Sequence, residues 1–187
     1  NDDTQTLIDI LKEYKVPATF FVVGSWVDKY PESVKALSDA GHQVQNHSNT
    51  HPHMPQLSKH QMRDELESCN SKIKAITGVC PTLLRPPYGD YDNALIETVD
   101  SLGMSAIQWS VDSLDYKSSS AEEISRRVLD KTKNGDIILM HNGTKFTADA
   151  LETLLPALCE KYTLVSVSDL IYKDNYTVDA AGRQHKN

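Results

Sequence analysis

Residues 16–24, with the sequence VPATFFVVG, form a continuous run of apolar, β-branched and aromatic residues that ends in glycine. Such a run is typical of a strand that is buried on both faces, as in the parallel sheets of α/β proteins. Apolar residues at three- and four-residue spacing predict helices on either side of it, over residues 4–14 and 31–40. We therefore expect an α/β fold in which strands and helices alternate.

The same alternation continues along the rest of the chain. The connections are short enough for repeated right-handed βα units around a parallel sheet. A length of 187 residues suits one domain, which we place at residues 1–173, with a polar tail at residues 174–187. Further strands are expected at residues 42–46, 83–84, 105–111, 136–140 and 163–167, and further helices at 58–77, 92–102, 121–133, 148–161 and 168–172.

Charge and hydropathy exclude two classes of protein. The net charge is −7 at pH 7, and Lys and Arg do not gather on one predicted face. A surface that binds nucleic acid is therefore not expected. No apolar stretch approaches the roughly 18 residues that a membrane-spanning helix needs, so no membrane span is expected either.

The cysteines carry little information on function. Cys69, Cys80 and Cys159 lack the CxxC spacing of a zinc knuckle, and an odd number of cysteines cannot all be paired within one chain. Three buried thiols are the favoured interpretation. A disulfide between Cys69 and Cys80 is the alternative, because sequence spacing does not fix the distance between two side chains.

Residues 47–53, with the sequence HSNTHPH, hold three of the seven histidines. His47 and His51 are four residues apart, and on a helical turn this spacing brings two imidazoles within reach of one metal ion. A catalytic zinc site commonly adds a carboxylate, for which Asp3 or the aspartate before it is a candidate. A polar histidine-rich loop and simple capping of the first helix are the alternatives. His53 is expected beside the site or at the surface.

Four polar clusters follow the C-terminal ends of expected strands. In a βα barrel these strand ends share one face, and that face carries the active site. Four such clusters are unlikely to meet there by chance, so the pattern predicts an enzyme. The clusters occupy residues 47–53, 85–90, 112–116 and 139–141.

His141 is the candidate general acid, because it follows a strand and is separate from the histidine pair. Its alternative is a hydrogen-bonded histidine at a strand end. Asp115 is its expected partner, since a carboxylate fixes the orientation of an imidazole. Asp112 suits the same role on sequence alone, or it is a turn residue.

The segment after the strand at residues 83–84 contains further candidates. Arg85 is expected to steer a catalytic carboxylate or hold substrate, with a structural salt bridge as the alternative. The two prolines that follow stiffen the loop, so the backbone N–H of Tyr88 would be held in one direction, as an oxyanion donor must be. Candidates for a small apolar substrate pocket, which core packing would equally explain, are Leu139, Trp109 and Pro87.

These motifs resemble those of the NodB-homology polysaccharide deacetylases, carbohydrate esterase family four, over residues 4–172. HSNTH at 47–51 is similar to the family's HSxxH motif, and RPPYG at 85–89 to its RPPYG motif. DSLDY at 112–116 resembles DSxDW, and LMHN at 139–142 resembles LxHD. The family includes peptidoglycan N-acetylglucosamine, chitin and acetylxylan deacetylases.

The resemblance implies a distorted (β/α)7 barrel and a metal-dependent hydrolase that removes N-acetyl groups from an extracellular or cell-wall polysaccharide. The metal is most often Zn2+, with Co2+, Ni2+ or Mn2+ as alternatives. The roles that the resemblance assigns are metal ligation by His47 and His51, orientation of the catalytic base by Arg85, oxyanion binding by the Tyr88 N–H, tuning of the general acid by Asp115, proton donation by His141 and contact with the acetyl methyl group by Leu139.

Three departures from the family pattern qualify this expectation. The family's first motif, TFDDG, supplies the catalytic base from a strand before the first helix, and this sequence begins at that helix. We therefore expect the first strand and the base on an upstream segment of the same protein, and little activity from residues 1–187 alone. Tyr116 stands where the family has Trp, and Asn142 stands where Asp is usual.

Two other functions remain open on sequence alone. An O-acetyl esterase that acts on acetylxylan would use the same scaffold and the same residues. A non-catalytic relative that binds metal and glycan would also show these motifs, and the missing first motif makes it plausible. Neither the polysaccharide nor the oligomeric state follows from the sequence.

Overall fold

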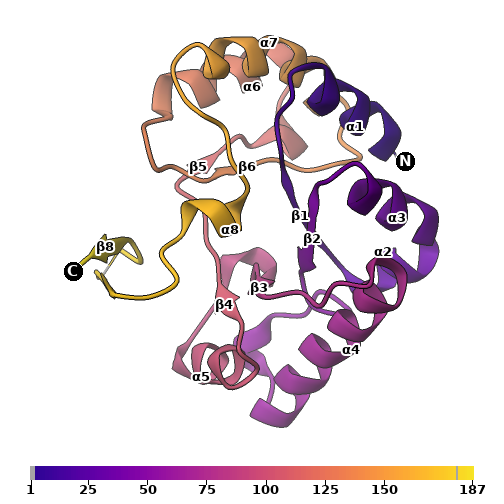
Figure 1. Cartoon of the computed structure of the whole chain (residues 1–187), viewed down its shortest axis with the longest axis vertical. Coiled ribbons are helices and arrows are strands. Elements are labelled where there is room, and N and C mark those ends of the chain that lie inside the picture. The colour runs from indigo at the N-terminus through magenta and orange to yellow at the C-terminus, as the bar shows by residue number, and fades with distance from the viewer. Residues whose placement is uncertain (1–2, 180) are drawn as a thin grey trace. The chain divides into compact units, whose positions relative to one another are not determined.

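The computed structural model describes residues 3–179 and 181–187, and it divides into two compact units. One unit comprises residues 19–108 and is called the 19–108 unit below. The other combines the residues before 19 with those from 109 onward, so its chain is discontinuous, and it is called the split unit. Figure 1 labels most of the helices and strands of both units.

The 19–108 unit is built on a four-stranded parallel sheet with the strand order β1-β2-β3-β4. Parallel strands present their C-terminal ends at the same edge, so the segments that follow β2 and β3 are neighbours. The strands are β1 (Thr19–Val22), β2 (Gln43–Asn46), β3 (Leu83–Leu84) and β4 (Ser105–Ala106). The helices of this unit are α2 (Gly24–Lys29), α3 (Pro31–Asp39), α4 (Lys59–Thr77) and α5 (Asn93–Ser101), with short 3-10 turns η1 (Met54–Gln56) and η2 (Pro87–Gly89).

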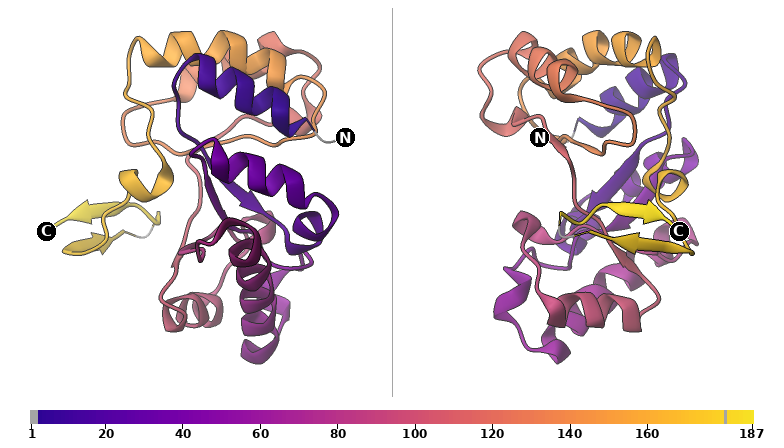
Figure 2. Two further views of the ribbon diagram at one scale, coloured as in Figure 1. Left: turned by 45° about the vertical axis from the view of Figure 1, so that its right-hand side comes forward. Right: turned by 90° about the vertical axis from the view of Figure 1, so that its left-hand side faces the viewer.

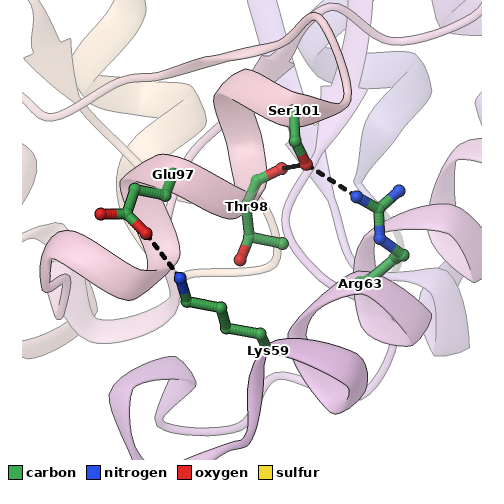
Figure 3. Close-up of a pocket in the computed structure, with 5 residues that line it drawn as sticks. All are labelled: Lys59, Arg63, Glu97, Thr98 and Ser101. Carbon is green, nitrogen blue, oxygen red and sulfur yellow. Dashed lines mark hydrogen bonds and ion pairs between the residues drawn. The ribbon is translucent and has the colours of Figure 1, made fainter.

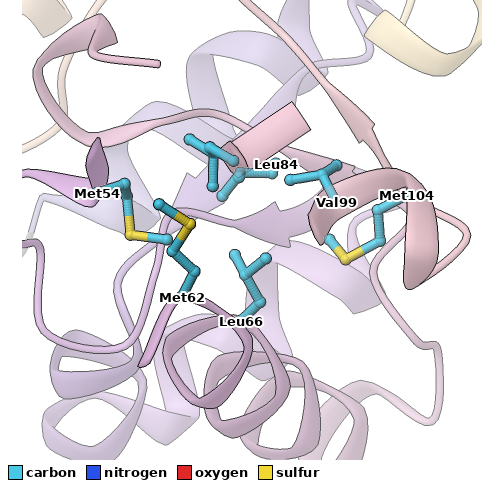
Figure 4. Packing of buried hydrophobic residues seen from close by; sticks show 7 residues of the cluster. Met54, Met62, Leu66, Leu84, Val99 and Met104 are labelled. Atoms are coloured by element: carbon cyan, nitrogen blue, oxygen red, sulfur yellow. The ribbon is translucent and has the colours of Figure 1, made fainter. Parts of the chain in front are cut away.

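Helix α4 begins and ends with recognisable signals. Ser58 and Gln61 form a capping box, in which each side chain bonds the other residue's backbone N–H. Gly78 ends the helix with φ +76°, a left-handed conformation that glycine adopts without strain. The inner face of α4 packs on a cluster of buried residues that Figure 4 shows from close by. That cluster consists of Met54, Met62, Leu66, Leu84, Leu95, Val99 and Met104.

The split unit contains a parallel strand pair and the helices that pack with it. Helices α6 and α7 pack against each other, and α1 packs on α7, as both views of Figure 2 show. A second buried cluster, which includes Ile124, Val128 and Leu154, fills this unit. Its elements are α1 (Thr4–Glu13), β5 (Val111–Asp112), η3 (Asp115–Lys117), α6 (Ala121–Lys131), β6 (Ile138–Leu139), α7 (Thr147–Cys159), α8 (Val167–Leu170), β7 (Tyr176–Val178) and β8 (Gln184–Lys186).

The predicted alternation of helix and strand is confirmed, but several strands differ from the expectation. The run at residues 16–24 yields only the four residues of β1, because the chain turns at Gly24 into helix α2. The strand expected at 105–111 is two strands, since β4 pairs with β3 in one unit and β5 pairs with β6 in the other. Residues 163–167 do not form the expected strand, and Val167 instead begins helix α8.

The segment expected as a polar tail contains an antiparallel hairpin, β7–β8. The carboxylate of Asp179 organises its turn, because it accepts hydrogen bonds from the N–H groups of Ala181 and Arg183 and contacts the His185 ring at 2.8 Å. The His185 contact and the backbone bonds lower the pKa of Asp179 to about 2. Turn chemistry of this kind is local to residues 179–185, and the polar composition of this segment does not reveal it.

The cysteine prediction is confirmed in part. All three cysteines are free, so the Cys69–Cys80 disulfide is not formed. Only Cys69 is buried, however, and Cys80 and Cys159 are exposed. The Cys69 thiol donates to the Val22 carbonyl at 3.4 Å, and burial raises its pKa to about 12. It therefore behaves as a small core residue.

Candidate active site

The first group of candidate residues follows β2 and β3 in the 19–108 unit. Asn46 and Leu84 are paired across the two strands, so His47 and Arg85 leave the sheet side by side. The His47 N–H donates to the Val22 carbonyl at 3.0 Å, and the Arg85 N–H donates to the Asn46 carbonyl at 3.0 Å. The sheet thus fixes the backbone of both residues.

The rings of His47 and His51 lie together, with their centroids 4.8 Å apart. The Nδ1 atom of His47 is 2.6 Å from the Arg85 carbonyl oxygen. A carbonyl oxygen only accepts hydrogen bonds, so Nδ1 of His47 is the donor in this contact. Metal-binding histidines are usually oriented in this way, by a carbonyl or carboxylate on the other ring nitrogen.

Arg85 is buried, and its guanidinium lies over the Phe21 ring, 4.3 Å from the ring centroid. Burial lowers the pKa of Arg85 to about 10, which leaves the side chain charged at neutral pH. A stacked, charged guanidinium is well suited to fix a carboxylate in two-point contact. This is the chemistry that the predicted steering role requires.

Tyr88 lies in η2 and has φ +60°, an unusual value for a residue with a side chain. Pro87, before it, is buried, and the Tyr88 side chain is 57% exposed. Its ring meets the His51 ring edge-on at 4.6 Å and stacks on the His53 ring at 4.0 Å. These contacts place the Tyr88 ring against the histidine run, and the oxyanion role of its N–H stays a prediction.

His53, the third histidine of the run, is not a partner of the other two. Its Nδ1 atom is 2.5 Å from a carboxylate oxygen of Asp90, and both side chains are 45% exposed. The stacked ring of Tyr88 ties this pair to the loop after β3. The expectation that His53 lies near the site or at the surface is confirmed.

The second group follows β5 and β6 in the split unit. Asp112 pairs with Leu139 across the two parallel strands, and the Ser113 N–H donates to the Leu139 carbonyl at 3.2 Å. Asp115 and His141 lie just beyond. The His141 Nδ1 atom is 2.7 Å from Asp115 Oδ1, and the His141 backbone N–H donates to Asp115 Oδ2 at 2.6 Å.

Asp115 is 2% exposed, and its carboxylate accepts hydrogen bonds from several sides. Besides the two from His141, it accepts one from the Thr147 hydroxyl at 2.7 Å and one from the Tyr116 N–H at 2.9 Å. Burial acts to raise the pKa of Asp115, but these bonds outweigh burial and leave its pKa below the ordinary value. A carboxylate that stays charged therefore holds Nδ1 of His141, whose side chain is 41% exposed.

The alternative partner, Asp112, is a turn residue. Its Oδ1 atom accepts a hydrogen bond from the Leu114 N–H at 2.9 Å, which supports the left-handed conformation of Leu114 at φ +54°. Of the three apolar pocket candidates, Leu139 and Pro87 are buried and Trp109 is half-buried. Contact of these residues with an acetyl group stays a prediction.

Asp3 occupies the N-cap position of α1 without a side-chain capping bond. Its carboxylate instead accepts a hydrogen bond at 2.8 Å from the N–H of Gly143, in the loop after His141. The capping bond is therefore not formed, whereas metal ligation by Asp3 stays a prediction. The aspartate before it lies outside the described residues.

The histidine pair fits part of a metal site. His47 and His51 are adjacent imidazoles, the nitrogen donors that zinc accepts, and the Arg85 carbonyl engages Nδ1 of His47. Catalytic zinc sites usually take three protein ligands. Over residues 3–179 and 181–187, however, no group of three His, Cys, Asp or Glu side chains is placed to hold a metal ion. The structure thus supplies two of the expected ligands.

Two polar side chains that support the site were not predicted. Thr147 binds Asp115, and Glu65 accepts three hydrogen bonds from residues between His47 and His51. Neither belongs to a recognisable motif, and each acts from a helix far away in the sequence. Only a distinctive local pattern would have identified them, and Thr and Glu at ordinary helix positions give none.

A small pocket of about 270 Å³ lies between α4 and α5 (Figure 3). Its charged groups are paired across the two helices: Lys59 with Glu97 at 2.5 Å, and Arg63 with the Ser101 hydroxyl at 2.7 Å. None of the predicted site residues lines it. It is a solvent-facing gap between two helices and offers no reactive group.

The family is established by comparison with known proteins. The model of the family described as "Polysaccharide deacetylase" matches residues 1–107, more than half of the chain. The chain belongs to the polysaccharide deacetylase family. Over 168 residues it is 37% identical to the peptidoglycan-N-acetylglucosamine deacetylase PgdA of Listeria monocytogenes, and the match covers 89% of this chain and 35% of PgdA.

Two solved structures of this family confirm the predicted α/β fold class. One is the peptidoglycan deacetylase PdaC of Bacillus subtilis, with a TM-score of 0.82 and 36% identity over 89% of this chain and 82% of the other. The second is a CE4 family pseudoenzyme of Bacillus anthracis, with a TM-score of 0.86 and 35% identity over 89% of this chain and 59% of the other. This polysaccharide deacetylase domain spans only 35% to 59% of the length of several curated relatives.

Proposed function

We propose that this domain is the catalytic part of a metal-dependent hydrolase that removes N-acetyl groups from a cell-wall polysaccharide outside the cell. Peptidoglycan N-acetylglucosamine and chitin-like oligomers are the substrates that its relatives and motifs favour. No described helix is long and apolar enough to cross a membrane. The observation that carries the proposal is the hydrogen-bonded pair of Asp115 and His141.

A module that only binds glycan gains nothing from a buried carboxylate that locks a half-exposed imidazole. A proton donor needs this arrangement, because the ring must present one nitrogen in a fixed direction. Asp115 holds Nδ1, so Nε2 of His141 is the atom that would deliver a proton. The accepting atom is the nitrogen of the departing sugar amine.

The 19–108 unit would serve the other half of the reaction. His47 and His51 would hold the metal, with Zn2+ as the first candidate and Co2+, Ni2+ or Mn2+ as alternatives. When bound, such an ion polarises a carbonyl group and lowers the pKa of bound water. The Tyr88 N–H would stabilise the oxyanion that forms as water adds to the acetyl carbonyl.

The proton that the attacking water loses requires a base. We place it, as the motif resemblance implies, on an aspartate upstream of residue 1, which Arg85 would orient. The reaction then balances: water supplies hydroxide to the acetyl carbon, the carbon–nitrogen bond breaks, and His141 protonates the amine. The products are acetate and a free amino sugar, with Leu139 proposed to contact the acetyl methyl group.

The test is acetate release from N-acetylglucosamine oligomers by zinc-loaded protein that includes the upstream segment. Release that disappears in His141→Ala and persists in His185→Ala supports the proposal. His185 is the matched control, since it also pairs with a carboxylate, Asp179, but in the C-terminal hairpin. Faster release from acetylxylan would favour an O-acetyl esterase instead.

A non-catalytic function is the second candidate. It is favoured by the similarity to the Bacillus anthracis pseudoenzyme, whose fold matches as well as that of any active relative named above. Binding of zinc and of N-acetylglucosamine oligomers without acetate release, in the extended protein, would establish it. Intact mass of the protein as purified from its source would first show whether an upstream segment is present.

A further inference from the structure

The loop that carries the histidine pair is held in an unfavourable backbone conformation. Ser48 has φ +65° and His51 has φ +63°, and both residues have side chains. Left-handed backbone at such residues persists only where the surroundings impose it. The loop therefore depends on contacts from outside, and these contacts show what holds the two imidazoles in place.

The strongest contact comes from Glu65, a half-buried residue on α4. Its Oε2 atom accepts hydrogen bonds from the backbone N–H groups of Asn49 and Thr50, both at 2.8 Å. Its Oε1 atom accepts a third from the Thr50 hydroxyl at 2.8 Å. One carboxylate thus binds the two residues that lead directly into His51.

The loop is also held from its inner side. The fully buried side chain of Asn46 accepts a hydrogen bond from the Ser48 N–H at 2.7 Å and donates to the Leu66 carbonyl at 2.9 Å. The Ser48 hydroxyl in turn accepts from the His51 N–H at 2.9 Å. Helix α4 therefore supports the loop in two ways. Glu65 binds the loop directly, and the Leu66 carbonyl holds the side chain of Asn46, which in turn binds the Ser48 N–H.

Helix α2 closes the third side. The N–H groups of Gly24 and Ser25 donate to the carbonyls of Ser48 and Asn49, at 3.0 Å and 2.9 Å. All of these contacts are within the 19–108 unit. The ligand loop is therefore held by protein groups on three sides, and such preorganisation favours tight binding by only a few ligands.

We propose that Glu65 is a positioning residue that presets His51, and with it the pair of imidazoles, for metal binding. The inference rests on the proposed metal site. Glu65 does not ligate the metal in this proposal, because its two oxygens are occupied by the three loop donors. A carboxylate suits these donors better than an amide, which has a single acceptor oxygen.

The experiment measures zinc affinity of the full chain by competition with a chromophoric chelator. Glu65→Ala is expected to bind zinc about 10- to 100-fold more weakly, as is typical when a group that orients a metal ligand is lost. Glu65→Gln keeps one acceptor for the two N–H groups, so its affinity is expected between those of Glu65→Ala and the wild type. Amide hydrogen exchange should accelerate at residues 49–51 in Glu65→Ala.

The matched control is Glu67→Ala, because Glu67 lies on the same helix and pairs with Arg63 at 3.1 Å rather than with the loop. Its zinc affinity should equal that of the wild type. Equal affinity in Glu65→Ala would overturn the inference. If Glu65→Ala does not fold, the single variants Thr50→Val and Glu65→Gln replace it. Wild-type zinc affinity in both of these variants would overturn the inference. Undiminished zinc binding by His51→Ala would instead refute the metal site itself.

Discussion

His47 in the 19–108 unit and His141 in the split unit both follow the end of a parallel strand, and both have Nδ1 engaged. The partner of His47 is the neutral carbonyl of Arg85, whereas the partner of His141 is the buried carboxylate of Asp115. A metal ligand must be a neutral imidazole with a free lone pair. A proton donor carries positive charge before it acts, and a carboxylate balances that charge. The choice of partner therefore matches the two proposed functions, metal ligation by His47 and proton donation by His141.

The two histidine sites also differ in how the supporting group is held. Between His47 and His51, main-chain N–H groups donate to the side chains of Glu65 and Asn46. These bonds fix the backbone of the loop that carries the two histidines. Around His141 the donors converge on Asp115, and the side chain of the acid is the part that is fixed. We therefore expect the first site to be sensitive to a change in the shape of its loop, and the second to be sensitive to the charge of Asp115.

The largest effect is expected from His141→Ala. Loss of a general acid lowers turnover about 10²- to 10⁴-fold, because the amine must then leave without a proton. Zinc affinity should not change, since His141 is not one of the predicted ligands. The measurement is kcat for acetate release from N-acetylglucosamine oligomers, beside zinc affinity, in the extended protein. Loss of zinc binding in this variant would contradict the proposal that His47 and His51 bind the metal while His141 only donates a proton.

Asp115→Asn should destabilise the protein and remove part of its pH dependence. The NH2 group of the new amide would face groups that are themselves hydrogen-bond donors. We expect this to lower the free energy of unfolding by about 3 kcal/mol at neutral pH. Because the folded-state pKa of Asp115 is lowered, its carboxylate stabilises the fold above the unfolded-state pKa, and this stabilisation is lost as pH falls through the folded-state pKa.

Urea unfolding of the wild type and of Asp115→Asn from pH 7 down to pH 3 checks this prediction. The difference in the free energy of unfolding should be largest near neutral pH and shrink in acid. Asp112→Asn is the control, since Asp112 accepts only the Leu114 N–H of a turn. A difference that is constant over the whole range would mean that Asp115 acts through packing and not through its charge.

Gly24→Ala tests the dependence of the first site on shape. A Cβ atom at this position would lie 2.3 Å from Asn49 Oδ1 and 3.1 Å from Asn49 Cα, so the Asn49 side chain must shift and the loop backbone must give slightly. Overpacking of this kind costs about 2 kcal/mol, and zinc affinity should fall with it. Adding Asn49→Ala should restore part of the stability and part of the zinc affinity, because it removes the Oδ1 atom that lies nearest to the new Cβ. Unaltered affinity in Gly24→Ala would show that the loop is less constrained than its contacts indicate.

The smallest effect is expected from Asp90→Asn. His53 and Asp90 form a histidine–carboxylate pair like His141 and Asp115, but each side chain is 45% exposed. Exposed ion pairs contribute only about 0 to 1 kcal/mol, so the free energy of unfolding should barely change. Thermal unfolding beside Asp115→Asn measures the contrast. A loss as large as that of Asp115→Asn would show that burial does not distinguish the two pairs.

The parts of the site that could be predicted from sequence are those that follow strand ends in short motifs. His47, His51, Arg85, Asp115 and His141 lie where the alternation of strand and helix predicted, and the structure brings them together within each unit. Whether both groups act on one substrate stays a prediction. Strand lengths were overestimated because apolar runs continue into coil and helix, as at Gly24.

The supporting residues could not be predicted, for a physical reason. Glu65 and Thr147 act on loops that reach them only through folding, and their hydrogen bonds span 15 and 32 residues. Asp3 was placed at the start of a helix, where a cap was the natural expectation, yet its partner is Gly143. Sequence patterns report local geometry, and these contacts depend on tertiary structure.

The discontinuity of the split unit has a consequence for synthesis on the ribosome. Helix α1 packs on α7, and the Gly143 N–H reaches Asp3 across 140 positions of sequence. All strands of the 19–108 unit emerge before α7 is made, and domains fold as units from the N-terminal side during translation. Nascent α1 therefore stays without α7 until residues 147–159 have been made, and it is exposed to chaperones and proteases for that interval. Helix α1 is thus synthesised before the 19–108 unit, but it gains its packing partner α7 only after that unit has been made.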